Sequence, residues 1–357
     1  MFYIRADGNT KIGAGHIMRC ISIAEALKNR GKVTIFITAD EESAKLISSK
    51  GFGVLNLKTK YYDMDGELEM LLPVLKDNDI ETLLIDSYSV TTNYMQQVGK
   101  RVKTIYMDDL GETIYPVDML INYNIYAPEI GYEEKYKFRL MKVPQLLIGC
   151  EYAPLRVEFQ TIDTKVRRMA KDVLITTGGS DPQNIAGKLL EVLRDAGMKY
   201  RGIQFHVVSG AFNKNIEKLR ELERENTNFH VYQNVRHMAE LMKKCDVAIA
   251  ACGSTMYELS SMGIPTVCYF FADNQKMVAE SFGKSVALNA GDISSDESGT
   301  IERILGYLDS YLDSYDMRNT ACEKMVQLLD GDGASRIADR LIQLERSRDD
   351  KMELRID

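Results

Sequence analysis

The sequence predicts an α/β protein built from two doubly wound domains, each a parallel sheet with helices on both faces. Three observations carry this prediction. At 357 residues the chain is longer than one hydrophobic core usually serves, which favours two domains of roughly 150 residues each. Short apolar runs alternate with helical segments in the first half. The same alternation restarts after Asp172.

The first half has the rhythm of repeated strand–helix–strand units. Apolar or β-branched runs that are typical of strands occupy residues 2–6, 33–38, 83–86 and 104–107. Between the first two runs, apolar residues recur at helical spacing from Ile17 to Leu27, and the pattern ends near Gly31. Because strands that are joined through helices pair in parallel, this half predicts one parallel sheet.

The second half repeats this architecture. A helix is predicted at residues 184–196, and strand runs lie at residues 173–177, 204–208, 229–232, 247–251 and 266–270. We therefore expect a first domain at residues 1–150, a linker at 151–171, a second domain at 172–297 and a C-terminal helical segment at 298–357. That last segment would pack over the first domain or extend the second. Two such domains facing each other across a cleft form the GT-B arrangement.

Composition and charge argue against several classes of protein. The net charge of -7 and the pI of about 5.4 disfavour a nucleic-acid-binding surface, which is usually basic. No apolar run approaches the roughly 20 residues of a membrane-spanning helix, and the first residues lack the pattern of a secretory signal. We therefore expect a cytoplasmic protein, and no motif calls for a cofactor.

The six cysteines are scattered without a CxxC pair, which is typical of buried, reduced thiols. Cys252 lies in a turn where a nucleophile would be useful. No basic residue stands beside it to lower the pKa of its thiol, so a structural role is favoured over a catalytic one.

The first turn that could carry chemistry is GNTKIGAGH, residues 8–16, between a predicted strand and a predicted helix. Its glycines allow the backbone to approach a ligand, and the helix start offers free N–H groups to a phosphate or a sugar oxygen. The turn fits neither the Walker A pattern nor the GxGxxG dinucleotide pattern.

His16 at the end of this turn is the candidate catalytic base. The positive end of a helix disfavours the cationic ring, and a neutral imidazole is what a general base requires. The alternative is a helix-start residue that is hydrogen-bonded to the turn. The spacing of His206, His230 and His237 does not suggest a metal site, so each is expected to be structural.

Two turns in the second half suit a nucleoside diphosphate. In CGSTMYE, Gly253, Ser254 and Thr255 would bind the diphosphate at a helix start, and Glu258 would bind the ribose hydroxyls. The alternative is a capping box. In TGGSDP, the backbone and hydroxyl of three residues could contact the diphosphate from its other side: Gly178, Gly179 and Ser180. Asp181–Pro182 is equally a helix start.

Several single residues complete the candidate set. Tyr88 and Asn274 each follow a predicted strand, at the sheet edge where open α/β sheets bind ligands. Asp108 and Asp109 could suggest a metal, but paired acids at a strand end more often cap a helix or hold a loop. We therefore predict no metal site.

Seven stretches together resemble the nucleotide-sugar hydrolases of pseudaminic acid biosynthesis and the related spore-coat polysaccharide proteins. They span about residues 1–290: RADGNTKIGAGHIMRC, LLIDSY, MDDL, INYN, GCEYAPLRVEF, TTGGSDPQN and ACGSTMYELSSMGIPTVCY. The resemblance implies hydrolysis of a UDP-linked 2,4-diacetamido-2,4,6-trideoxy-altrose to UDP and the free sugar. It also implies that His16 is the catalytic histidine. It places Tyr88 and Asn274 on the substrate side, and Gly179, Ser254, Thr255 and Glu258 on the nucleotide side. From the glycine turn itself, we expect Gly13 and Gly15 on the substrate side as well.

This activity is chemically plausible without a metal. UDP is a weakly basic leaving group, so electrostatic support at a helix start would suffice while His16 deprotonates a water aimed at the anomeric carbon. Three alternatives stay open: a GT-B glycosyltransferase, a nucleotide-sugar-binding module without catalysis, and a nucleotide-sugar 2-epimerase. A transferase with a lipid acceptor should expose an apolar patch near the first domain's cleft, and no segment stands out as one. The exact sugar, the bond that is cleaved and the oligomeric state are open.

Overall fold

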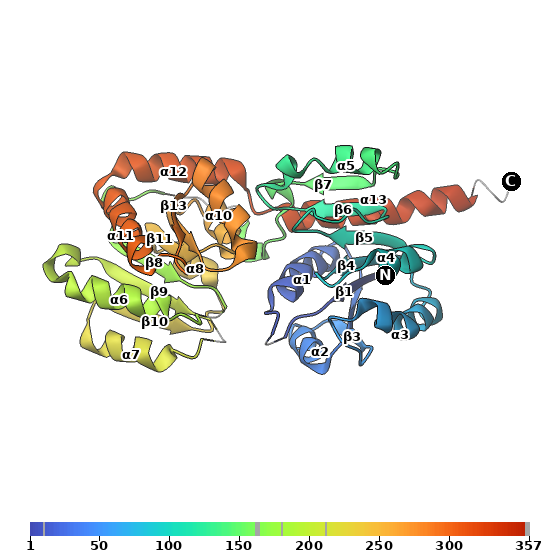
Figure 1. The fold of residues 1–357 in the computed structure, drawn as a ribbon, viewed down its shortest axis with the longest axis horizontal. Coiled ribbons are helices and arrows are strands. Elements are labelled where there is room, and N and C mark those ends of the chain that lie inside the picture. Colours follow the sequence, from blue (N-terminus) through green and yellow to red (C-terminus); the bar gives the residue numbers. More distant parts are fainter. Residues whose placement is uncertain (10, 161–164, 180, 211–212, 354–357) are drawn as a thin grey trace. The chain divides into compact units, whose positions relative to one another are not determined.

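The structure is a computed structural model that describes residues 1–9, 11–160, 165–179, 181–210 and 213–353, with side chains up to residue 345. Two compact units make up the chain (Figure 1). The first comprises Met1–Arg156 and Asp332–Asp357, and the second comprises Val157–Gly331. The chain therefore passes between units within the stretch 151–171. The segment 298–357 is divided, because its residues up to Gly331 pack with the second unit and the rest with the first.

The first unit is built on a seven-stranded sheet in which every pair is parallel. Its strands are β1 (Phe2–Ala6), β2 (Thr34–Thr38), β3 (Gly53–Asn56), β4 (Thr82–Asp86), β5 (Lys103–Met107), β6 (Met119–Asn122) and β7 (Gln145–Ile148). Their order across the sheet is β3-β2-β1-β4-β5-β6-β7. The central strands β1 and β4 are buried along their whole length, as expected for a parallel sheet that is covered on both faces.

Helices cover this sheet (Figure 1). They are α1 (Gly15–Lys28), α2 (Glu41–Ser48), α3 (Met64–Asp77), α4 (Thr92–Gly99), α5 (Tyr132–Phe138) and α13 (Gly333–Glu353). Helices α2 and α4 start where a side chain caps them, because Asp40 accepts from the N–H of Ser43 and Thr91 from that of Tyr94. Helix α13 packs on α1, where Asp339 pairs with Arg30 at 2.6 Å.

A buried ion cluster anchors the end of β1. The guanidinium of Arg5 is inaccessible to solvent and donates to both oxygens of Glu67 on α3, at 2.7 and 2.6 Å. It also contacts Asp7 at 2.5 Å, and Asp7 accepts from the backbone N–H of Ala39 at 2.8 Å. A buried charge is tolerated only when it is paired in this way. The cluster therefore fixes the start of the glycine turn that follows Asp7.

The second unit repeats the design with a six-stranded parallel sheet. Its strands are β8 (Asp172–Thr176), β9 (Gln204–Ser209), β10 (Phe229–Gln233), β11 (Val247–Ala251), β12 (Thr266–Phe270) and β13 (Leu288–Asp292), in the order β10-β9-β8-β11-β12-β13. The helices are α6 (Ile185–Asp195), α7 (Ile216–Glu225), α8 (Met238–Met242), α9 (Thr255–Ser261), α10 (Asp273–Ser285), α11 (Glu297–Asp313) and α12 (Tyr315–Leu328). The predicted two doubly wound α/β domains are thus confirmed.

Both sheets contain a point where the strand order reverses. In the first unit the chain builds outward from β1 to β3 and then returns to add β4 on the other side of β1. In the second unit the same reversal falls between β8 and β11. Open α/β sheets bind ligands outside the carboxyl ends of the strands at such a switch point. Topology alone therefore directs attention to the segments that follow β1, β4, β8 and β11.

The predicted strands agree with the structure to within one residue at each end, but four strands had not been predicted: β3, β6, β7 and β13. None of the described helices is both long and apolar enough to cross a membrane.

Candidate active site

The glycine turn after β1 is shaped by two of its glycines. Gly13 has a φ of +77°, which favours a residue without a side chain, and its N–H donates to the carbonyl of Asn9 at 2.8 Å. At Gly8 a Cβ atom would lie 2.9 Å from Cδ1 of Ile17, so glycine allows the turn to pack on α1. By contrast, a Cβ at Gly15, the first residue of α1, would meet no protein atom within 4 Å. The turn thus leaves open space at Gly15, the residue before His16.

His16 lies in the first turn of α1 and is held by a carboxylate from β4. Its Nδ1 lies 2.5 Å from Oδ1 of Asp86, the last residue of that strand. Asp86 is buried and also accepts two hydrogen bonds from the Arg19 guanidinium, at 2.6 Å each. Burial opposes ionisation of Asp86, but the charges of Arg19 and His16 hold its pKa well below its usual range.

An ionised Asp86 decides the proton arrangement on the His16 ring. Because a carboxylate can only accept, Nδ1 must be the donor in this pair. In the neutral ring, Nε2 then carries the lone pair. No described residue forms a hydrogen bond with Nε2. The alternative that His16 is bonded to its own turn is not what the structure shows, since the ring contacts Asp86, Arg19 and Tyr88.

Arg19 and Tyr88 close a ring of contacts around His16. Arg19 donates to Oδ1 of Asp109 at 2.9 Å, and the Tyr88 hydroxyl donates to Oδ2 of the same carboxylate at 2.8 Å. The Tyr88 ring meets the His16 ring edge-on, with centroids 4.6 Å apart and an interplanar angle of 83°. Burial alone would raise the pKa of Asp109, but the charge of Arg19 outweighs it and leaves that pKa lowered, so Asp109 is a carboxylate. Burial and the Asp109 charge raise the pKa of Tyr88, which is a neutral phenol.

The acidic pair after β5 holds this network and its loop. Asp108 accepts from the N–H groups of Leu110 and Gly111 and from the Tyr132 hydroxyl. Asp109 also accepts from the Asn124 amide at 3.0 Å. The loop-holding role predicted for these acids is therefore confirmed for Asp108. Among the described residues, no group of three His, Cys, Asp or Glu side chains is placed to hold a metal ion.

In the second unit, the candidate turns follow β8 and β11 and so flank the switch point. Gly178 has a φ of +81°, and added Cβ atoms at Gly179 and Gly253 would each meet nothing within 4 Å. Ser254 is the N-cap residue of α9, with helical backbone angles, and its hydroxyl forms no capping hydrogen bond. Glu258 follows one turn later on α9 and is partly exposed. Ser180 lies outside the described residues.

Several other residues singled out in the sequence form contacts within the fold or lie on its surface. Asp181 accepts from the N–H groups of Ile185 and Ala186 and so holds the start of α6. His206 pairs with Asp172 at 2.8 Å. A hydrogen bond with Cys268 and burial raise the pKa of the Cys252 thiol, which supports the predicted structural role. Asn274 is an exposed residue in the first turn of α10.

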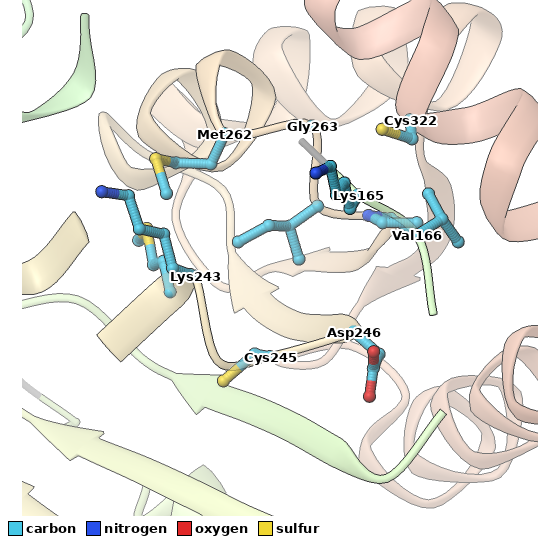
Figure 2. A pocket seen from close by; sticks show the side chains of 11 residues that line it. Lys165, Val166, Lys243, Cys245, Asp246, Met262, Gly263 and Cys322 are labelled. Carbon is cyan, nitrogen blue, oxygen red and sulfur yellow. The ribbon is translucent and has the colours of Figure 1, made fainter. Parts of the chain in front are cut away.

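A small pocket of the second unit lies at the amino ends of the strands, away from the candidate turns (Figure 2). Cys245 and Asp246 line it just before β11 begins, and Ile264 and Pro265 line it just before β12. Its volume of about 60 Å³ is far below the roughly 300 Å³ at which small-molecule sites begin. It lies at the amino ends of the strands and is no candidate for a nucleotide sugar.

Sequence reasoning missed the partners of His16. Arg19 was the available signal, because a cation three residues after His16 interrupts the apolar pattern of α1. Asp86 was a second signal, as a carboxylate that ends a buried strand. Their contact joins residues 67 positions apart, and no local pattern encodes it.

Comparisons with known proteins point to nucleotide-sugar and polysaccharide biosynthesis proteins as relatives. A family profile described as "LpxB: Lipid-A-disaccharide synthetase" matches residues 157–277, about a third of the chain. An uncharacterized protein of Methanocaldococcus jannaschii is 26% identical over 80% of this chain, which spans 58% of that protein. The spore coat polysaccharide biosynthesis protein SpsG of Bacillus subtilis is 24% identical over 94% of this chain and 95% of SpsG. The UDP-2,4-diacetamido-2,4,6-trideoxy-beta-L-altropyranose hydrolase of Campylobacter jejuni is 24% identical over 78% of this chain and 95% of its own. The chain is a homologue of these proteins. The resemblance predicted from the sequence stretches is thereby confirmed.

Solved structures confirm the fold class. MurG of Acinetobacter baumannii superposes with a TM-score of 0.68 at 11% identity, over 96% of this chain and 99% of that chain. The UDP-GlcNAc 2-epimerase of Neisseria meningitidis superposes with a TM-score of 0.61 at 13% identity, over 96% of this chain and 100% of that chain. At such low identity the likeness establishes the GT-B fold and nothing about activity.

Proposed function

We propose that this chain hydrolyses a UDP-linked 2,4-diacetamido-2,4,6-trideoxyhexose of the altrose configuration to UDP and the free sugar, a step toward a pseudaminic-acid-like sugar. The observation that carries the proposal is the His16–Asp86 pair, which sits at the switch point of the first sheet. Homology to a protein named for this hydrolysis supports the substrate class.

In the proposed reaction, His16 acts as general base. Asp86 accepts from Nδ1–H and fixes the ring, while Nε2 takes a proton from water. The water oxygen forms a bond to the anomeric carbon, and the bond from that carbon to the phosphate oxygen breaks. UDP leaves with the electron pair, and attack from the opposite face inverts the configuration. The proton on Nε2 returns to solvent before the next turnover.

The sugar side of the reaction is assigned to the first unit. The turn leaves open space at Gly15, the residue before His16, and Gly13 gives the turn its shape. Tyr88, half-exposed and in contact with the His16 ring, is suited to bind a sugar hydroxyl or acetamido group. Asn274, on α10 of the second unit, is the exception and is assigned to the sugar on the resemblance alone.

The nucleotide side is assigned to the second unit. The backbone N–H groups of Gly253, Ser254 and Thr255 would support the charge that develops on the leaving diphosphate, and Glu258 would bind ribose hydroxyls. Gly178 and Gly179 would contact the diphosphate from the neighbouring turn. Support comes from their position at the second switch point and from the space left at Gly179 and Gly253.

Release of UDP without any acceptor tests the proposal. The purified chain should release UDP from UDP-2,4-diacetamido-2,4,6-trideoxy-altrose, and His16→Ala should slow release about 10³-fold, within the range for loss of a general base. His237→Ala is the matched control, because His237 also stands at a helix start but is exposed in the other unit. It should release UDP at the wild-type rate.

The rival functions give different products. UDP release that needs a sugar or lipid acceptor would overturn hydrolysis in favour of glycosyl transfer. A sugar product with altered configuration at C2, read by NMR, would instead identify an epimerase. Wild-type binding of the UDP-sugar without turnover would identify a binding module.

A further inference from the structure

The turn between α5 and β7 exposes two large apolar side chains. Phe138, the last residue of α5, is 90% exposed, and Leu140 is 95% exposed. The next most exposed large apolar side chain among the described residues, Met198, is 73% exposed. The expectation that no apolar patch lies near the first domain's cleft concerns a different place, because this turn precedes β7 and lies at the amino ends of the strands. The turn leads from α5 into β7, the edge strand of the first sheet (Figure 1).

Leu140 occupies a backbone position where leucine is unfavourable. The N–H of Met141 donates to the carbonyl of Tyr136, and the N–H of Leu140 donates to that of Lys137, each at 3.0 Å. These two bonds form a Schellman motif, in which Leu140 is the residue that takes left-handed angles, with a φ of +53°. Glycine is the usual residue there, because a Cβ atom disfavours these angles. Leucine at position 140 therefore favours neither the backbone conformation of the turn nor the packing of the core.

The turn itself is firmly anchored. Tyr132 and Tyr136 of α5 are buried, and Met141 and Val143 pack against the same apolar cluster. Phe138 and Leu140 lie in the sequence between these inward residues, and both side chains are almost fully exposed. Their exposure is a property of a packed turn and not of a frayed end.

Two unpaired cations accompany the apolar pair. Lys137 forms an ion pair with Glu133, and Lys135 donates to the carbonyl of Gly111. Arg139 and Lys142 are both exposed, and neither forms an ion pair with any described residue. The turn thus presents two apolar side chains and two free positive charges, with Arg139 between Phe138 and Leu140 and Lys142 two residues after Leu140.

We propose that Phe138, Arg139, Leu140 and Lys142 form a lipid-docking tip that binds an anionic membrane surface. Apolar side chains would enter the acyl boundary while Arg139 and Lys142 pair with lipid phosphates. A stable protein partner usually needs about 800 Å² on each side, far more than two side chains supply. A lipid interface accepts single inserted side chains, because it has no fixed shape to match. This inference is independent of the proposed hydrolysis.

Vesicle flotation with the full chain tests the tip. Wild-type protein should float with vesicles of phosphatidylglycerol and phosphatidylcholine and should stay behind with phosphatidylcholine alone. Leu140→Gly should bind the anionic vesicles at least fivefold more weakly, while its unfolding temperature equals or exceeds that of the wild type. Arg139→Gln with Lys142→Gln should weaken binding about 25-fold, at about fivefold for each charge.

Matched controls separate the tip from general surface effects. Met198→Ser removes an exposed apolar side chain from the second unit, and Lys50→Gln with Lys60→Gln removes two exposed cations of the first. Both should float as the wild type does. The proposal is overturned if wild-type protein ignores anionic vesicles, or if Leu140→Gly binds them equally well. It is also overturned if sedimentation shows a dimer that Leu140→Gly dissociates, because a second copy then covers the turn.

Discussion

At the switch point of the first sheet, five side chains form a closed network, whereas the switch point of the second sheet is lined by glycine backbone and hydroxyls. The network members touch one another at fixed distances: His16, Asp86, Arg19, Asp109 and Tyr88. At the second switch point, Gly179 and Gly253 border open space, and the hydroxyl of Ser254 forms no capping hydrogen bond with α9. The first switch point thus holds the His16 imidazole in a fixed orientation. The second offers open space and backbone N–H groups.

This difference teaches how two copies of one fold can take different tasks. A base must point its lone pair in one direction, and that requires side chains locked by ion pairs. A phosphate group is satisfied by backbone donors, which only glycine-rich turns expose closely enough. The comparison therefore predicts that substitutions in the network lower turnover, while substitutions in the glycine turns weaken nucleotide binding.

Asp86→Asn should have the largest effect. An amide can donate to Nδ1, which favours the ring form with its lone pair on the wrong nitrogen, so we expect kcat to fall about 10³-fold. KM should change little, because Asp86 is buried and out of reach of substrate. Steady-state kinetics on UDP release check this. A variant that kept wild-type kcat would break the assignment of Asp86 as the residue that positions His16.

Gly15→Ala and Gly253→Ala form a matched pair with smaller effects. Each adds one methyl group where the protein itself has open space, so both variants should fold with wild-type stability. Gly15→Ala should lower kcat/KM roughly 10-fold with unchanged UDP affinity, and Gly253→Ala should weaken UDP binding by a similar factor. Titration calorimetry with UDP separates the two. Loss of UDP affinity in Gly15→Ala would contradict the assignment of the sugar to the first unit and of the nucleotide to the second.

Tyr88→Phe should be milder still. It keeps the ring edge against His16 but removes the hydroxyl that donates to Asp109, so we expect kcat to fall about 3- to 10-fold. Tyr88→Leu removes the ring as well and should cost more. If the phenylalanine variant lost as much activity as Asp86→Asn, the hydroxyl would have to contact the reacting atoms directly.

The Asp86 pair also predicts how stability varies with pH. The folded-state pKa of Asp86 is lowered, so its stabilisation is complete above the usual value near 3.8 and is lost as pH falls below it. Comparing His16→Ala with His16→Ala/Asp86→Asn removes the imidazole from the measurement. The difference in unfolding free energy, about 3 kcal/mol at pH 7, should hold to about pH 5 and shrink toward pH 3. A difference independent of pH would mean that Asp86 is not ionised.

The fold could be predicted because its signals are local. Buried runs such as β1, β4 and β11 are apolar along their length, and each is followed by a turn and a helix. The missed strands β3 and β13 are half-exposed, so their sequences carry weak apolar patterns. The glycine turns could be predicted as well, because each is a continuous stretch of sequence that directly follows a strand.

The network and the exposed turn could not be predicted in this way. Arg19 meets Asp109 across 90 residues, and only the order of strands β1, β4 and β5 brings them together. Leu140 takes left-handed angles that nothing in a leucine signals. The electrostatics of His16 were judged from the helix start alone, and the carboxylate that fixes its ring came from a distant strand.

Hydrolysis of the UDP-sugar in oxygen-18 water tests most directly whether His16 delivers water to the anomeric carbon. The mass of the released UDP decides the result, since the free sugar exchanges its anomeric oxygen with solvent. The account predicts unlabelled UDP from the wild-type chain and almost no UDP from His16→Ala. UDP carrying one oxygen-18 on its terminal phosphate would mean attack at phosphorus and would contradict it.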